Sequence, residues 1–239
     1  MRPRLPGFAA RVPSESVETD NLVGRRRVLP VVTDTAAGAE SEGVGSARGA
    51  RGTRLDRVRL GLVVWGVLVS QVFLYPGLEE TVAAVGGGDG ILAPTWFLVA
   101  EFAAFVAFAV AWGVLSDSVG RRVPFVVVGA LGGAASYVAV ALAPSVGLDF
   151  GVVLALRVVG GAFTIGAFSL AITMLMDLSG GHGRNMGAAG IAIGLGAALG
   201  SVVGGQLSTL GALAPLYASA TVLLAAGLLA ATVPDRTPS

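Results

Sequence analysis

The sequence predicts an all-α protein that crosses a membrane six times. Its 239 residues are 54% hydrophobic and only 13% charged, whereas a soluble domain has about 25% charged residues. The mean hydropathy is +0.79. Uncharged stretches of about twenty residues, the length of a spanning helix, recur from residue 59 onward. Helices satisfy their own backbone hydrogen bonds in lipid, and the alternating ten-residue segments typical of a β-barrel are missing.

The charge distribution excludes several functional classes. All sixteen basic residues are Arg, and eleven of them lie in residues 1–59 beside seven of the fifteen acidic residues. The basic charge therefore belongs to a tail rather than to a nucleic-acid-binding face. The absence of Cys excludes disulfides, Fe–S clusters and thiol catalysis, and a single His leaves little for zinc or a Ser-His-Asp triad. We expect no metal, no cofactor and no enzymatic activity.

Residues 1–57 are rich in Pro, Gly, Ser, Arg and Glu and have no sustained hydrophobic period. We expect them to be a disordered, Arg-rich cytoplasmic tail. No apolar core follows the first arginines, so the tail does not resemble a secretory signal. Two interpretations stay open: an arm that lies near anionic lipid, or an upstream extension from a start codon placed too early.

The spans are delimited by charges. Arg59 and Glu79 enclose an uncharged run of nineteen residues, and Glu101 is the only charge in the next apolar run. The last fifty uncharged residues are too long for one span and break around 206–211. The six expected spans are 60–78, 91–115, 124–144, 150–174, 186–206 and 212–233, within a bundle over 58–235, and 236–239 form a short second tail.

The arginines also predict the orientation. Arg residues flank alternate junctions between spans, whereas the junctions 79–90, 145–149 and 207–211 contain none. Positive residues stay on the cytoplasmic side. We therefore expect an integral multi-pass protein of the plasma membrane with both termini in the cytoplasm.

One junction carries a recognisable motif, GVLSDSVGRRV, at 113–123. It places an acid near a helix end, a glycine at a turn position and two basic anchors. The motif resembles the loop between helices two and three of the major facilitator superfamily. Its members here are Gly113, Asp117, Gly120, Arg121 and Arg122. The resemblance implies a charge-relay latch between conformational states, which Ser118 and Val123, two departures from the family pattern, would weaken.

Two further stretches resemble the same family. Arg157 stands four residues before Gly161 in the fourth span, similar to the family's fourth-helix arginine motif, with Gly160 in place of the usual glutamine. The fifth span carries GAALGSVVGG, with Ser201 where the family's antiporter motif has proline. Its glycines are Gly196, Gly200, Gly204 and Gly205. For most glycines in the spans, close packing of helix backbones is the simpler interpretation.

The family's usual body has twelve helices in two halves, each built from two inverted three-helix repeats around a central cavity. The resemblance implies that this chain is the N-terminal half. It implies alternating-access transport of a small solute, with export coupled to H⁺ as the hypothesis for direction and coupling. The chain would work as a homodimer or with a separately encoded second half. The alternative is a truncated, transport-inactive fragment or a regulatory membrane subunit.

Glu101 and Arg157 are the only ionisable residues deep in the expected spans. A charge at the bilayer centre costs roughly 2.5–3.5 kcal/mol on insertion scales, so it needs a partner or water. Arg157 lies about 12 Å along its helix from Asp149, at a depth similar to Glu101, so the two can pair. One hypothesis is that the pair lines the cavity and Glu101 exchanges a proton during transport. The other is a static ion pair that locks helices two and four together.

Overall fold

The structure, a computed structural model, describes residues 36–88 and 90–235, with side chains from Thr53 onward. The chain divides into two compact units, Met1–Glu42 and Gly43–Ser239. Nearly all of the first unit lies outside the described residues, as do residues 236–239 of the expected second tail. The helix bundle belongs to the second unit.

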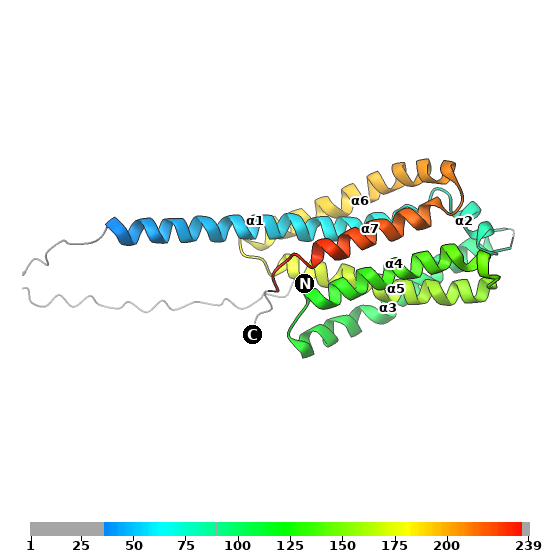
Figure 1. Cartoon of the computed structure of the whole chain (residues 1–239), viewed down its shortest axis with the longest axis horizontal. Coiled ribbons are helices and arrows are strands. Elements are labelled where there is room, and N and C mark those ends of the chain that lie inside the picture. The colour runs from blue at the N-terminus through cyan, green and yellow to red at the C-terminus, as the bar shows by residue number, and fades with distance from the viewer. Residues whose placement is uncertain (1–35, 89, 236–239) are drawn as a thin grey trace, which may run out of the picture. The chain divides into compact units, whose positions relative to one another are not determined.

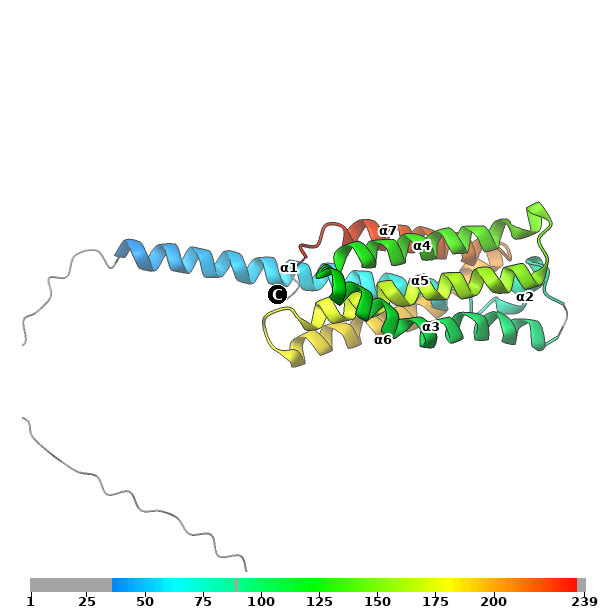
Figure 2. The same cartoon turned by 90° about the horizontal axis from the view of Figure 1, so that it is seen from below.

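All regular structure in the described residues is helical, in the order α1 (Ala36–Val72), α2 (Leu78–Ala84), α3 (Leu92–Val119), α4 (Val123–Leu142), the 3₁₀ turn η1 (Ala143–Val146), α5 (Phe150–Met176), α6 (His182–Leu210) and α7 (Ala214–Ala230). The helices from α3 to α7 run in alternate directions alongside one another (Figures 1 and 2). Helix α4 packs against α5 and α7, and α3 packs against α5.

Four helices of the described residues are long and apolar enough to cross a membrane. They are α3, α4 continued by η1, α5 and α6, which correspond to the second to fifth expected spans. Helix α7, the sixth, is apolar but shorter, with 17 residues. That all six segments cross a bilayer, as two inverted repeats, stays a prediction.

The first expected span differs from the structure at both ends. Helix α1 begins at Ala36, so the described part of the expected disordered tail, 36–57, is helical, while residues 1–35 lie outside the described residues. Helix α1 also ends at Val72 rather than at 78. The sequence Tyr75-Pro76-Gly77 explains the early end, because proline disfavours helical geometry in the residue before it and cannot donate a backbone hydrogen bond.

Local sequence sets the other helix ends. Gly120 ends α3 in a left-handed conformation (φ 69°), with its N–H donated to the carbonyls of Ser116 and Asp117. Glycine adopts this conformation without steric cost. Asp149 caps α5, because its carboxylate accepts the N–H of Val152 at 3.1 Å.

Small residues bring the helices close together. A Cβ built on Gly129 of α4 would lie 2.6 Å from the backbone nitrogen of Ala167 in α5. Such a distance is sterically forbidden, so glycine is what permits this crossing. The core around the crossings is apolar, and its largest fully buried side chains include Tyr137, Phe97, Leu60, Leu74 and Leu175.

The alternating helix directions separate charges between the two ends of the bundle. One end, which we call the arginine end, holds the α3–α4 and α5–α6 loops and the end of α7. Its residues include Arg57, Arg122, Asp177, Arg184 and Asp235. The opposite end carries Glu79, Glu80 and Asp149.

Candidate functional site

Glu101 of α3 and Arg157 of α5 form an ion pair inside the bundle, between Nη2 of Arg157 and Oε2 of Glu101. The two residues are only 1% and 3% exposed. The Tyr137 hydroxyl, from α4, donates to Oε1 of Glu101 at 3.4 Å. Gln71 of α1 approaches the same carboxylate without a hydrogen bond of ordinary geometry. Four helices therefore contribute a polar side chain to one buried cluster.

Aromatic rings surround the Arg157 guanidinium. Its Cζ lies 4.4 Å from the ring centroid of Phe97 and 5.2 Å from that of Tyr137. Phe97 precedes Glu101 by one helical turn, so a single face of α3 supplies both a ring and a carboxylate. Contacts between a buried cation and an aromatic face stabilise by up to about 2 kcal/mol. The Nε of Arg157 is nevertheless buried without a hydrogen-bond partner.

Gly161 allows this pair to form. It follows Arg157 by one turn, and a Cβ at this position would lie 2.6 Å from the carbonyl oxygen of Glu101. Any larger residue would push α5 away from α3 at the level of the ion pair. The spacing of Arg157 and Gly161 thus has a packing reason in addition to the family resemblance.

The hypothesis from the sequence places the Glu101–Arg157 pair on the wall of a cavity. In the structure the pair is buried among α1, α3, α4 and α5, and its place on a cavity wall stays a prediction. Sequence reasoning also missed Phe97, Tyr137 and Gln71. A signal was present for the last two, since each is a polar side chain next to a serine in a mostly apolar span.

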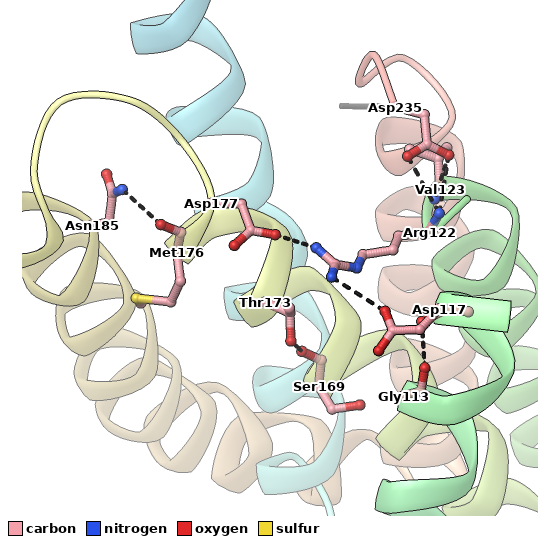
Figure 3. A network of polar contacts seen from close by, with 11 residues as sticks. Gly113, Asp117, Arg122, Val123, Ser169, Thr173, Met176, Asp177, Asn185 and Asp235 are labelled. Atoms are coloured by element: carbon pink, nitrogen blue, oxygen red, sulfur yellow. Dashed lines mark hydrogen bonds and ion pairs between the residues drawn. The ribbon is translucent and has the colours of Figure 1, made fainter. Parts of the chain in front are cut away.

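A second polar network, the Arg122 network, lies at the arginine end (Figure 3). The guanidinium of Arg122 contacts Asp177, at the end of α5, through Nη1. Its Nη2 lies 3.3 Å from Oδ1 of Asp117, near the end of α3. One guanidinium therefore joins the ends of two helices to the start of α4.

Asp235, which follows α7, completes the Arg122 network (Figure 3). Its carboxylate accepts the backbone N–H of Arg122 at 3.0 Å and that of Val123 at 3.2 Å. These are the first amides of α4, which has no capping side chain of its own. The end of α7 thus supplies the N-cap of α4.

The other residues of the 113–123 motif lie beside this network. Gly113 has open space where a Cβ would lie, and its carbonyl accepts the Ser116 hydroxyl at 3.0 Å. Gly120 terminates α3. Arg121 is exposed. Of the two adjacent arginines, it is Arg122 that bridges the helices, a distinction that the sequence did not make.

Arg57 ties α1 to the loop between α5 and α6. Its Nε donates to Oδ1 of Asn185 at 2.8 Å, and its Nη2 donates to the carbonyl of Ser179 at 2.8 Å. Asn185 is fully buried and donates in turn to the carbonyl of Leu178 at 2.6 Å. By sequence alone Arg57 belongs to the expected tail and Asn185 carries no signal, because neither residue belongs to a periodic pattern.

The glycine motif of α6 packs largely on α1. A Cβ built on Gly196 would lie 3.1 Å from Leu68, and one built on Gly200 would lie 2.8 Å from Val72. A Cβ built on Gly204 would lie 2.6 Å from the carbonyl oxygen of Phe73. Two of the four motif glycines, Gly196 and Gly200, therefore line the contact between α1 and α6, and Gly204 packs on the backbone of Phe73 just after α1 ends. A Cβ at Gly205 would lie 3.8 Å from Cβ of Pro76, an ordinary contact distance.

Comparison with known proteins agrees with this architecture. The family model described as Major Facilitator Superfamily matches residues 91–239, more than half of the chain and the whole of α3 to α7. Comparison with curated proteins and with solved structures gave no match. The match covers the helices that are long and apolar enough to cross a membrane, and it covers both polar clusters apart from Gln71 of α1. This chain therefore belongs to the Major Facilitator Superfamily, a family of membrane transporters.

Proposed function

We propose that this chain is the N-terminal half of an alternating-access transporter that exports a small solute in exchange for protons. The observation that carries this proposal is the buried ion pair of Glu101 and Arg157, shared by α3 and α5. Ionisable residues inside a membrane are costly and typically mark a substrate or proton pathway. This pair is the candidate for that pathway.

Protonation of Glu101 gives the pair a way to couple to movement. A neutral Glu101 no longer attracts Arg157, and a buried guanidinium without a counter-charge is strongly disfavoured. The Nε of Arg157, which is buried without a hydrogen-bond partner, adds to the free-energy cost of keeping the guanidinium inside the bundle. Proton uptake would therefore favour a state in which α3 and α5 separate and Arg157 reaches water or an anionic group of the solute.

The Arg122 network would act as the latch of the cycle. Opening the arginine end requires Arg122 to release Asp117, Asp177 or both. Loss of these contacts changes the equilibrium between the states with the arginine end closed and open, and it leaves the contacts with the solute unchanged. We infer that the arginine end faces the cytoplasm of the plasma membrane, with both termini on that side, because positive residues are retained there.

A second half would complete the cavity. Along α3 and α6 most side chains are exposed in this chain, although both helices are strongly apolar. We propose that a second copy, or a separately encoded six-helix chain, covers part of these two faces. The solute would then bind between the two halves.

The test uses inverted membrane vesicles whose membrane contains the full chain. Respiration generates a pH gradient across this membrane, and the fluorescence of acridine orange reports the size of that gradient. Small organic solutes are added one at a time, and solute-dependent loss of the gradient reports proton exchange. We expect Glu101→Gln to abolish this signal and Glu80→Gln, an exposed glutamate at the opposite end, to preserve it. Undiminished exchange in Glu101→Gln would remove Glu101 from the mechanism.

A further inference from the structure

An apolar groove of about 440 Å³ lies between α1 and α6 near the arginine end. The two helices lie side by side (Figure 1), and they touch at Gly196 and Gly200. The groove is lined by Gly61, Leu62 and Trp65 of α1 and by Ile191, Leu195 and Leu199 of α6, with Arg57 at one end. Its volume is in the range of small-molecule sites.

The groove runs along the helix axes, the direction in which a lipid acyl chain would lie. Its lining covers residues 58–65 of α1 and 188–199 of α6. At 1.5 Å per residue these stretches are roughly 12 Å and 18 Å long. Both helices run along the bundle, so the groove extends from the arginine end toward the middle of the membrane, parallel to the acyl chains of one leaflet.

The end of the groove at Arg57 is positively charged. The two hydrogen-bond acceptors of the Arg57 guanidinium, an amide oxygen of Asn185 and a backbone carbonyl, are neutral, so they leave its charge available to an anion. Arg54 and Arg184 are exposed and precede the lining residues Val58 and Ala188 by one helical turn on the same faces. Arg184 also lies in the first turn of α6, where the helix dipole favours negative charge.

We propose that this groove binds an anionic phospholipid, with one acyl chain against Trp65 and the phosphate among Arg54, Arg57 and Arg184. The apolar lining matches a hydrocarbon chain, and the three arginines complement a headgroup of net negative charge. The bound lipid would rest on α1 and on the start of α6, the two elements that Arg57 joins. The second half proposed above would then cover the part of α6 outside this groove. The lipid site does not depend on which side of the membrane the arginine end faces.

Trp65 provides a direct reporter. The full chain is reconstituted in bilayers of unlabelled phosphatidylcholine. A small, varied fraction of this lipid is replaced either by phosphatidylglycerol or by phosphatidylcholine, in each case with brominated acyl chains. Bromine quenches tryptophan on contact, and Trp65→Phe identifies the signal of Trp65 against Trp96 and Trp112 of α3. We expect brominated phosphatidylglycerol to quench Trp65 at a mole fraction about tenfold below that of brominated phosphatidylcholine.

Two sets of variants test the parts of the site. Arg54→Gln with Arg184→Gln should reduce the preference for phosphatidylglycerol severalfold, because only Arg57 is then left to bind the headgroup. Gly61→Leu fills the groove and should reduce quenching of Trp65 by both lipids. Gly190→Leu is the matched control, since a Cβ there also meets open space but outside the groove. Unchanged circular dichroism melting of each variant shows that it is folded.

Two results would overturn the proposal. Equal quenching by the two lipids at every mole fraction would show that the arginines select no headgroup. Absence of quenching by either lipid, together with cross-links between cysteines placed at residue 62 of two copies, would show that a second copy occupies the groove.

Discussion

Asp235 accepts the backbone N–H of Arg122 at 3.0 Å, although the two residues are 113 positions apart in the sequence. The same carboxylate accepts the N–H of Val123. Through this pair of hydrogen bonds the last residue before the C-terminal tail caps the start of α4. The arginine end is thus held by a backbone cap as well as by the ion pairs of the Arg122 side chain.

Replacement of Asp235 with Ala should destabilise the arginine end. Loss of an N-cap costs about 1 kcal/mol, and here it also removes the hydrogen bonds that tie the segment after α7 to the start of α4. We expect a lower unfolding midpoint in detergent, measured by circular dichroism, and partial recovery in Asp235→Asn. Asp149→Ala is the control, because it removes a cap within one segment only. An unfolding midpoint in Asp235→Ala equal to that of the original chain would contradict the assignment.

Replacement of Arg122 with Gln should open the arginine end more often. The chain has no Cys, so a single Leu60→Cys in the small cavity lined by Arg122 and Asp177 reports opening by its labelling with a maleimide. Two partly exposed ion pairs contribute about 1–2 kcal/mol together, which corresponds to labelling roughly five- to thirtyfold faster. Arg121→Gln should leave the labelling rate unchanged. Equal rates in the two variants would exclude Arg122 as the latch.

The sequence was sufficient for the four long apolar helices α3 to α6 and for the burial of Glu101 and Arg157, because long uncharged runs and isolated ionisable residues leave a strong pattern. It was insufficient where a residue acts through a distant partner. In the sequence Asp235 marks only the end of the last uncharged run, since nothing near it reveals that its carboxylate caps α4. Likewise, the depth of Glu101 and Arg157 showed that the two can pair, but not that Phe97 and Tyr137 enclose them.

Gly161→Ala should weaken the contact between α3 and α5. The new Cβ would lie 2.6 Å from the carbonyl oxygen of Glu101, so the helices must separate. Overpacking of this kind costs about 1–3 kcal/mol. Gly187→Ala, on an open face of α6, should instead be neutral or stabilising, since Ala is about 1 kcal/mol better than Gly in a helix. Unfolding midpoints that rise in both variants would show that Gly161 does not set the helix distance.

If a second copy of the chain covers α3, some residues of α3 in one copy should lie next to the same residues in the other copy. Val110 of α3 is exposed on an apolar face, and Val110→Cys in native membranes is expected to form a cross-linked dimer on mild oxidation. Leu228→Cys, equally apolar and exposed on α7, serves as the control and should remain monomeric. A strictly monomeric Val110→Cys, with no second chain captured by a bifunctional maleimide, would argue against self-association through this face.

The Glu101–Arg157 pair should show strong coupling in a double-mutant cycle. Glu101→Gln alone leaves a buried guanidinium without a counter-charge, and Arg157→Gln alone leaves a buried carboxylate, each at a cost of about 3–5 kcal/mol. The variant with both substitutions removes both charges, so its free energy of unfolding should fall by much less than the sum of the single losses. Denaturant unfolding in detergent micelles measures all four proteins. A double variant with additive losses would mean that the two charges act independently, and the pair could then not convert protonation of Glu101 into movement of α3 against α5.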